Sequence, residues 1–172
     1  MTSPDDLLQH AARPLPPVDR WQPAESIDSQ MRIDAAGRWF HQGSLIQRPA
    51  MVQAFSTLLL RDRQGQHWLM TPQCRQSIAV EDAAFMAVDV AREGAALVFR
   101  LNTGDRIEAG PDHALRVRGT ADAPASYLAV RHGCEARLDR STWLQLADLA
   151  GEAPDGSYAV TSNGTRFVLE PA

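Results

Sequence analysis

The chain has 172 residues, of which 44% are hydrophobic and 22% charged, as is usual for one globular domain or two small ones. Its net charge of −4 excludes a protein drawn as a whole onto nucleic acid, so we expect no nucleic-acid polymer as a partner. No uninterrupted apolar run approaches the roughly 18 residues that span a bilayer, so we expect no membrane partner.

Two features favour a reduced, cytoplasmic environment. The first ten residues are acidic and lack the apolar core of a signal peptide. Cys74 and Cys134 are the only two cysteines in the sequence, and their spacing gives no zinc framework and no basis for inferring a disulfide. We therefore predict a cytoplasmic protein.

Residues 1–30 are predicted to form a proline-rich arm, because successive prolines favour extended backbone with few hydrogen bonds. Trp21 is expected to fix this arm to the body of the protein, since an exposed indole is costly.

Residues 31–83 are predicted to form a first strand–helix–strand unit. A β-hairpin is expected at 31–41, and strands are expected at 67–71 and 77–80. Between them Pro49 suits the first position of a helix. The helix is predicted from apolar residues that recur at helical spacing: Met51, Val52, Phe55, Leu58 and Leu59.

Residues 84–172 are predicted to form a second, β-rich unit with one helix. Turn residues separate four expected strands, at 85–91, 96–101, 106–109 and 114–117. A hairpin around His132-Gly133 leads to a helix that Asp139 or Ser141 can cap. A last hairpin is expected across Asn163-Gly164, a pair that favours tight turns.

The two halves read alike, as strand–strand–helix–strand–strand. Their alignment places Arg48 with Arg140 and Thr71 with Thr161. We therefore predict an α+β fold, mostly antiparallel β, built from two similar ββαββ-type units. Any two segments of this kind look alike at this level, so the pattern alone leaves true duplication open.

The sequence contains no signature of catalysis or of a metal site. No G-x-S-x-G elbow, glycine-rich phosphate loop or metal-ligand spacing occurs, so no catalytic residue, metal ligand or cofactor is predicted. Arg48 and Arg140 precede the helices, where an anion such as phosphate can bind; the alternative is a surface arginine paired with a carboxylate. Glu81-Asp82 is either a solvated turn or a polar contact to a ligand.

Five segments, in order from about Met31 to the C-terminus, resemble the bacterial domain-of-unknown-function family numbered 1285. They are MRIDAAGRWFHQGSLIQRP, AMVQAFSTLLLRDRQGQHWLMTP, IAVEDAAF, LNTGDRIEAGPDHALRVR and YLAVRHGCEARLDRSTWLQL. The chain departs from the family pattern at Gln73 and Cys74, where charged residues are usual, and at Ala84, where a proline is usual. If this segment borders the site, the choice of ligand differs.

The resemblance implies a duplicated α+β core whose second unit is similar to a pleckstrin-homology-like fold. It also implies a nucleotide-type ligand bound where the two units meet, and a role in signalling with a protein partner. The motif residues that the resemblance carries over as ligand-binding candidates are Trp39, His41, Arg48, Thr71, Glu81, Asp82, Asn102, Asp105, His113 and Arg131.

Three functions are compatible with these observations. The first is a non-catalytic sensor of a small molecule or nucleotide, the second a protein–protein adaptor that uses the pleckstrin-like half, and the third a hydrolase or transferase. An enzyme needs an acid–base or nucleophile cluster in a cleft, and nothing in the sequence predicts one. The oligomeric state does not follow from the sequence.

Overall fold

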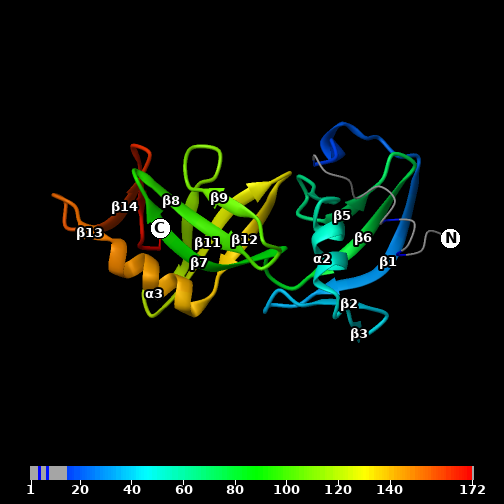
Figure 1. Ribbon diagram of the computed structural model, residues 1–172, viewed down its shortest axis with the longest axis horizontal. Helices are drawn as coiled ribbons and strands as arrows, with labels where there is room; N and C mark the ends of the chain where they lie inside the picture. The colour runs from blue at the N-terminus through cyan, green and yellow to red at the C-terminus, as the bar shows by residue number, and fades with distance from the viewer. Residues whose placement is uncertain (1–3, 5–6, 8–14, 172) are drawn as a thin grey trace. The chain divides into compact units, whose positions relative to one another are not determined.

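The computed structural model describes residues 4, 7 and 15–171, and it divides into two compact units (Figure 1). The first unit comprises the chain up to Ala84 together with Arg131–Cys134; the second comprises Phe85–Val130 and Glu135 to the C-terminus. Part of the predicted arm, residues 1–3, 5–6 and 8–14, lies outside the described residues. Each unit is described by itself below.

The first unit contains a six-stranded sheet in the order β3-β2-β1-β6-β5-β4 (Figure 1). Its central strands β1 and β6 run parallel, and all other neighbours run antiparallel. A short 3-10 helix η1 (Val18–Arg20) precedes the sheet, and helix α2 (Pro49–Ser56) joins β3 to β4. The strands are β1 (Glu25–Ile33), β2 (Trp39–His41), β3 (Ser44–Leu45), β4 (Leu59–Arg61), β5 (His67–Met70) and β6 (Cys74–Val80).

The second unit contains a six-stranded sheet in the order β10-β11-β12-β7-β8-β9 and a three-stranded sheet β13-β14-β15. Helix α3 (Arg140–Leu149) connects them. The strands of the large sheet are β7 (Phe85–Glu93), β8 (Ala96–Leu101), β9 (Arg106–Glu108), β10 (Leu115–Thr120), β11 (Ala123–Arg131) and β12 (Cys134–Leu138). Those of the small sheet are β13 (Gly151–Glu152), β14 (Tyr158–Ser162) and β15 (Thr165–Val168).

The two large sheets share one topology, which supports duplication. In each, two three-stranded meanders are joined by a parallel pair made of the first and the last strand, β1 with β6 and β7 with β12. Strands β1–β6 therefore correspond to β7–β12 in order. The fold consists of mixed and antiparallel sheets with two α-helices among the described residues.

This correspondence corrects the predicted repeat. Helix α2 lies between the two meanders of its sheet, whereas α3 follows the complete second sheet, so Arg48 and Arg140 are not equivalent positions. The repeating unit is six strands rather than ββαββ. The sequence alignment failed because every antiparallel hairpin has the same two-residue periodicity, so the final hairpin β14–β15 resembled β5–β6 without being its counterpart.

The first strand begins at Glu25, earlier than the predicted start at Met31, and a bulge hides this from the sequence pattern. Between Asp28 and Met31 the pairing with β6 shifts, and Gln30 takes a positive φ of 58°. Ser29 Oγ donates to the Ser77 carbonyl at 2.7 Å and accepts from the Met31 amide at 3.0 Å. Because a bulge interrupts alternation, apolar periodicity becomes visible only from Met31 onward.

Each unit has its own apolar core. In the first, Trp39 and Phe55 are almost fully buried, and their rings stack with centroids 6.3 Å apart. In the second, Phe85 and Phe99 of the large sheet and Leu146 of α3 are fully buried. Within the described part of the chain, neither helix is long and apolar enough to cross a membrane.

Candidate functional site

The first unit contains a cavity of about 360 Å³ between the β2–β3 hairpin, the segment after β3, and α2. This volume lies in the range of small-molecule sites. Apolar side chains form much of its wall: Pro4, Met31, Leu45, Ile46, Met51 and Phe55. Its polar lining consists of His41, Ser44, Gln47 and Arg48.

The path of the backbone places the polar residues at this cavity. Gln42 and Gly43, both with positive φ, turn β2 back into β3. The Ile46 amide then donates to the Trp39 carbonyl at 2.8 Å, which holds the end of β3 against β2. Arg48 is extended, as a residue before proline prefers, and Pro49 opens α2.

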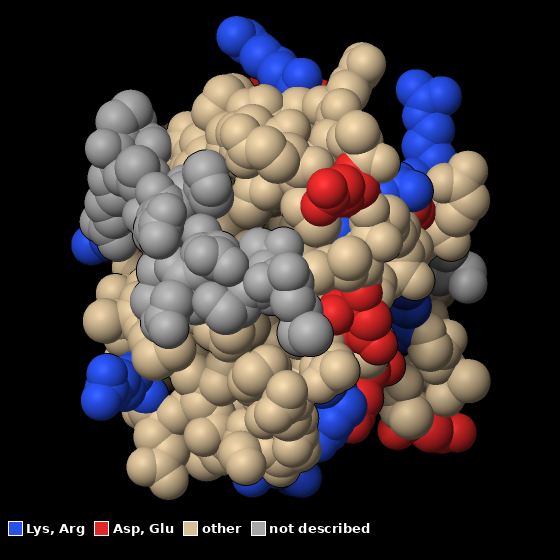
Figure 2. Space-filling view, turned by 90° about the vertical axis from the view of Figure 1, so that its right-hand side faces the viewer, with Lys and Arg blue, Asp and Glu red and all other residues tan. Residues whose placement is uncertain are grey.

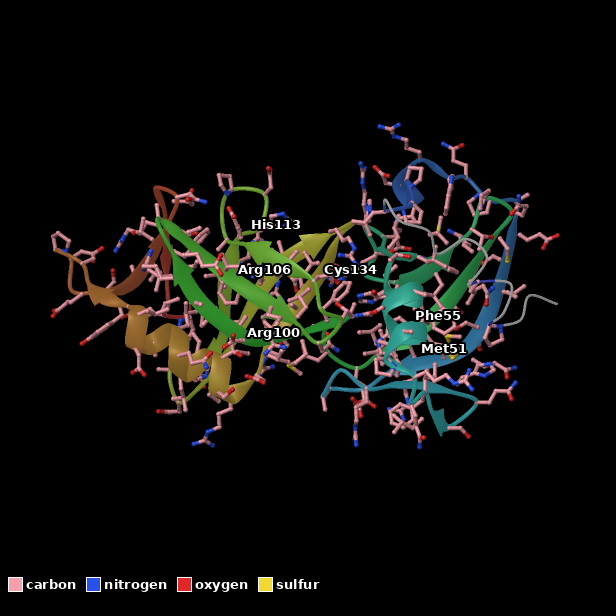
Figure 3. The ribbon with its side chains drawn as sticks, viewed as in Figure 1. Met51, Phe55, Arg100, Arg106, His113 and Cys134 are labelled. Atoms are coloured by element: carbon pink, nitrogen blue, oxygen red, sulfur yellow. The ribbon has the colours of Figure 1, made fainter. Side chains whose placement is uncertain are left out.

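Helix α2 supplies the opposite wall. Met51 and Phe55 are one turn apart, and their side chains therefore project from the same face of the helix, as Figure 3 shows. Phe55 also stacks on Trp39, which lies behind the cavity and does not line it. The predicted Trp39 is thus a core residue that supports the wall.

The polar side chains of the cavity have hydrogen-bonding capacity to spare. Among the described residues, no side-chain hydrogen bond or ion pair involves His41, Ser44, Gln47 or Arg48. Imidazole, hydroxyl, amide and guanidinium groups together can both donate and accept. A ligand in this cavity can therefore gain hydrogen bonds without breaking any that the protein already makes.

Two of the ten predicted residues, His41 and Arg48, meet in this cavity, and the other eight lie elsewhere. Thr71 closes the β5–β6 turn: its Oγ1 accepts from the Cys74 amide at 3.0 Å and donates to the Cys74 carbonyl at 2.9 Å. Glu81 forms an ion pair with Arg32 at 2.6 Å and accepts from the Ala35 amide at 2.9 Å. Neighbouring Asp82 is exposed. Thr71 and Glu81 thus stabilise the sheet at their positions.

The candidates of the second unit also make structural contacts, one within a turn and two between a turn and a strand. Asn102 Oδ1 accepts from the Met86 amide at 3.1 Å, and Asp105 accepts from the Thr103 hydroxyl. A ring nitrogen of His113, which Figure 3 labels, lies 3.0 Å from the Ala129 carbonyl. None of these three residues is among the residues that line the cavity of the first unit.

Arg131 belongs to the first unit and reaches the end of α2. Its Nη2 donates to the Ser56 carbonyl at 3.4 Å, so a cation faces the C-terminus of this helix. A cation at the C-terminus of a helix interacts favourably with the helix dipole. Arg131 therefore fixes α2 and is absent from the lining of the cavity.

Charge is dispersed around these features. On the face drawn in Figure 2, the arginine side chains stand apart from one another and form no continuous basic patch outside the grey residues. No group of His, Cys, Asp and Glu among the described residues has the arrangement to hold a metal ion. Cys74 and Cys134 are both buried, and neither forms a disulfide.

Four groups away from the cavity have shifted pKa values. Burial alone would raise the pKa of Asp34, but hydrogen bonds from the Arg38 backbone and side chain outweigh it and lower this pKa. A hydrogen bond from the Trp68 indole lowers the pKa of Asp62, and the Ser157 hydroxyl does the same for Asp155. Burial lowers the pKa of His132.

Sequence reasoning missed most of the cavity wall. Met31 and Met51 were identified as apolar positions of a strand and a helix, and nothing in their spacing distinguishes a cavity wall from a filled core. Gln47 and Arg48 directly precede the helix-opening proline. This polar pair was the sequence signal available for polar residues at the cavity.

The fold and this cavity together define a class: a two-unit β-sheet protein whose first unit has a cavity of small-molecule size that is open to solvent, with Ser44, Gln47 and Arg48 exposed at it. In comparisons with known proteins, the family model described as "Domain of unknown function (DUF1285), N-terminal domain" matches residues 16–83. A second family model, "Protein of unknown function (DUF1285), C-terminal domain", matches residues 84–169. The chain belongs to the DUF1285 family, as its sequence motifs predicted.

Two solved structures are similar to this chain. A DUF1285 family protein from Silicibacter pomeroyi DSS-3 is 38% identical with a TM-score of 0.85, and the match covers 96% of this chain and 95% of that one. A DUF1285 family protein from Shewanella baltica OS155 is 22% identical with a TM-score of 0.58, covering 70% of this chain and 91% of that one, and shows the fold alone. No curated protein matches the chain.

Proposed function

We propose that the first unit is a non-catalytic binding module for a small nucleotide-type anion. The observation that carries this proposal is the set of polar side chains, His41, Ser44, Gln47 and Arg48, that face one cavity without partners among the described residues. A cavity with an apolar wall and a few convergent polar groups is the usual form of a small-molecule site.

The cavity suits a ligand with a charged end and a flat, apolar body. Arg48 carries a planar guanidinium that can bind a phosphate through two hydrogen bonds. The base or another ring can lie against the half-buried Met51 and the exposed Leu45, since thioether and aliphatic groups pack well on flat rings. His41 can donate a further hydrogen bond to the anion or the sugar.

The lining supports binding rather than catalysis. Among the described residues that line the cavity, His41 is the one imidazole, and no carboxylate or thiol accompanies it. General acid–base or nucleophilic catalysis usually needs a second such group within hydrogen-bond reach. A hydrolase or transferase therefore has less support here than a sensor.

A role in signalling forms part of the same proposal. How firmly α2 is held would differ between the ligand-free and the ligand-bound first unit. A protein partner can bind these two forms with different affinities. Three expectations remain predictions: the pleckstrin-homology-like character of the second unit, its use as an adaptor surface, and a ligand where the two units meet.

A thermal-shift screen of the full chain with AMP, GMP, ATP and uncharged adenosine tests the proposal. A nucleotide at 100 times its Kd adds about 2.7 kcal/mol of stability, which for a chain of this size raises Tm by about 5–10 °C. We expect a rise with the phosphorylated compounds and a smaller one with adenosine. A flat response across the panel would favour the adaptor function.

The variant His41→Ala sharpens this screen. It removes one polar group of the cavity and should reduce the nucleotide-dependent shift. Arg63→Ala is the matched control for side-chain loss on the surface of the same unit, since Arg63 is exposed and lies outside the cavity. Equal shifts in both variants would remove His41 from the site.

A further inference from the structure

A second cavity, of about 430 Å³, lies in the second unit and is independent of the one described above. Strands β11 and β12, the turn before β11 and the first two turns of α3 surround it. Its lining residues are Asp122, Pro124, Ser126, Arg137, Leu138, Arg140, Trp143 and Leu144. We propose that it is a binding site for a small anion that carries a planar ring, such as an aryl phosphate or aryl carboxylate.

Ser126 is the feature that a filled core does not explain. The residue is 3% exposed, and its Oγ has no hydrogen-bond partner in the described structure. A buried hydroxyl is nearly always paired, because leaving it unpaired costs the hydrogen bonds that it made to water. Ser126 lines this cavity, so a ligand there can supply the missing partner.

Two arginines give the cavity its preference for anions. Arg137 is held in place by its neighbours: Nη1 donates to the Tyr127 hydroxyl at 3.3 Å, and the guanidinium carbon lies 5.4 Å from the centre of the Tyr127 ring. Arg140 is exposed, and its side chain makes no hydrogen bond or ion pair with another described residue. A guanidinium fixed by the protein beside a free one can bracket a phosphate or carboxylate.

Helix geometry sets the aromatic part of the site next to Arg140. Trp143 and Leu144 follow Arg140 by three and four positions, so the three side chains share one face of α3. The Trp143 side chain is half-buried, and Leu144 is 53% exposed. An indole and a leucine open to solvent beside a cation provide a surface on which a flat ring can pack.

The charged groups around this site differ in whether they attract or repel an anion. The start of α3 contributes little on its own, because the Asp139 carboxylate accepts from the Thr142 amide at 2.8 Å and already caps the helix. Asp122, which is exposed, adds a second carboxylate at the cavity. The attraction for an anion therefore comes from the side chains of Arg137 and Arg140, and Asp122 opposes it.

Nuclear magnetic resonance titration of the full chain tests the proposal with four probes: phenyl phosphate, benzoate, inorganic phosphate and phenol. We expect signals of Ser126, Arg140 and the Trp143 indole to shift with phenyl phosphate or benzoate at lower concentrations than with inorganic phosphate or phenol. The first two probes distinguish a phosphate from a carboxylate ligand. Absence of shifts at these residues, or equal binding of inorganic phosphate and phenyl phosphate, would overturn the proposal.

Substitutions separate a binding role from a structural one. Arg137→Ala and Arg140→Ala should weaken phenyl phosphate binding at least tenfold, while Arg116→Ala, at an exposed arginine of β10 outside the cavity, should leave it unchanged. Ser126→Ala should lower the affinity while leaving Tm of the free protein unchanged or raised, because it removes an unpaired polar group. Unaltered affinity in all three site variants would contradict the proposal.

Binding at this site can be distinguished from binding in the cavity of the first unit. Arg48→Ala should not alter the shifts at Ser126 and Trp143, since Arg48 lines the other cavity. Shifts confined to Met51 and Phe55 would support the cavity of the first unit and overturn the one proposed here. These experiments can therefore contradict the proposal for either site without contradicting the other.

Discussion

At the scale of single residues, Gly133 shows how closely the β11–β12 turn fits the first unit. Its φ is +78°, and a Cβ atom at this position would lie 2.6 Å from the Arg61 carbonyl oxygen. The Arg61 amide in turn donates to the His132 carbonyl at 2.9 Å. The turn is thus in backbone contact with β4, and neither of these two segments can move away from the other without losing this hydrogen bond.

Gly133→Ala is therefore expected to lower the free energy of unfolding by about 2–5 kcal/mol, the sum of left-handed backbone strain and of steric overlap with Arg61. Gly43→Ala is the matched control: its φ is +81°, but no atom lies within 4 Å of an added Cβ. It should cost only the strain, about 1–2 kcal/mol. Urea unfolding measures both, and equal losses would contradict the contact with Arg61.

His132 makes the stability of the first unit depend on pH. Burial lowers the pKa of its imidazole, Arg131 lowers it further, and Asp19 opposes both. Below the ordinary pKa of 6.5 the unfolded chain binds a proton before the folded protein does. The free energy of unfolding should therefore fall as the pH drops from 6.5 toward the lowered pKa of the folded state.

His132→Asn tests this dependence. Asparagine tolerates the positive φ of 49° at this position, and Asn-Gly suits the tight turn, but its side chain does not titrate. We expect the variant to lose part of the decline in stability between pH 7 and pH 5, measured by urea unfolding at each pH. A wild-type slope in the variant would show that other groups cause the decline.

At the scale of elements, the start of α3 depends on one side chain. Asp139 accepts from the Thr142 amide at 2.8 Å and so pairs one of the free N–H groups of the first turn. Asp139→Ala should cost about 1 kcal/mol. Asp148→Ala, at an exposed carboxylate within the same helix, should cost less, and thermal unfolding can compare the two. A larger loss for Asp148 would rule out capping as the cause.

Local elements followed from local residues, and pairings between distant ones did not. The apolar spacing from Met51 to Phe55 predicted α2, but Leu58 and Leu59, which were assigned to the same helix, lie beyond its end at Ser56, and Leu59 begins β4. Asp139 predicted the start of α3, and Asn163-Gly164 predicted the turn between β14 and β15. The parallel pairs β1–β6 and β7–β12 escaped prediction, because alternation along a strand carries no information about its partner. The wrong alignment of Arg48 with Arg140 has this same origin.

At the scale of the whole molecule, the first unit is not continuous in sequence. The matched family regions divide at residues 83 and 84, but Arg131–Cys134 belongs structurally to the first unit. A fragment ending at Ala84 lacks the His132 carbonyl that accepts from Arg61, and it lacks the nearly fully buried Cys134.

We expect this fragment to be less stable than the first unit of the full chain by about 2–4 kcal/mol, from lost hydrogen bonds and burial. Urea unfolding followed by tryptophan fluorescence reports on this unit once Trp143, the tryptophan of the second unit, is replaced by phenylalanine in the full chain, because Trp39 and Trp68 lie in the first unit. A fragment as stable as the unit in the full chain would contradict the contribution of Arg131–Cys134.

The candidate site was predicted only in part for a similar physical reason. Arg48 stood out because a cation precedes a helix-opening proline, and His41 because it ends a strand within a family motif. Thr71, Glu81 and Asn102 belong to the same motifs, yet they stabilise turns and strand ends. Sequence motifs do not separate residues that bind a ligand from residues that hold the fold.

The most direct test of the account is calorimetric titration of the full chain with AMP, comparing wild type, Arg48→Ala and Arg63→Ala. We predict that Arg48→Ala weakens binding at least tenfold, because a charge-assisted hydrogen bond to phosphate is worth about 1.5–3 kcal/mol, and that Arg63→Ala binds as wild type does. Equal affinity in all three proteins, or no binding by the wild type, would contradict a nucleotide site in the cavity of the first unit.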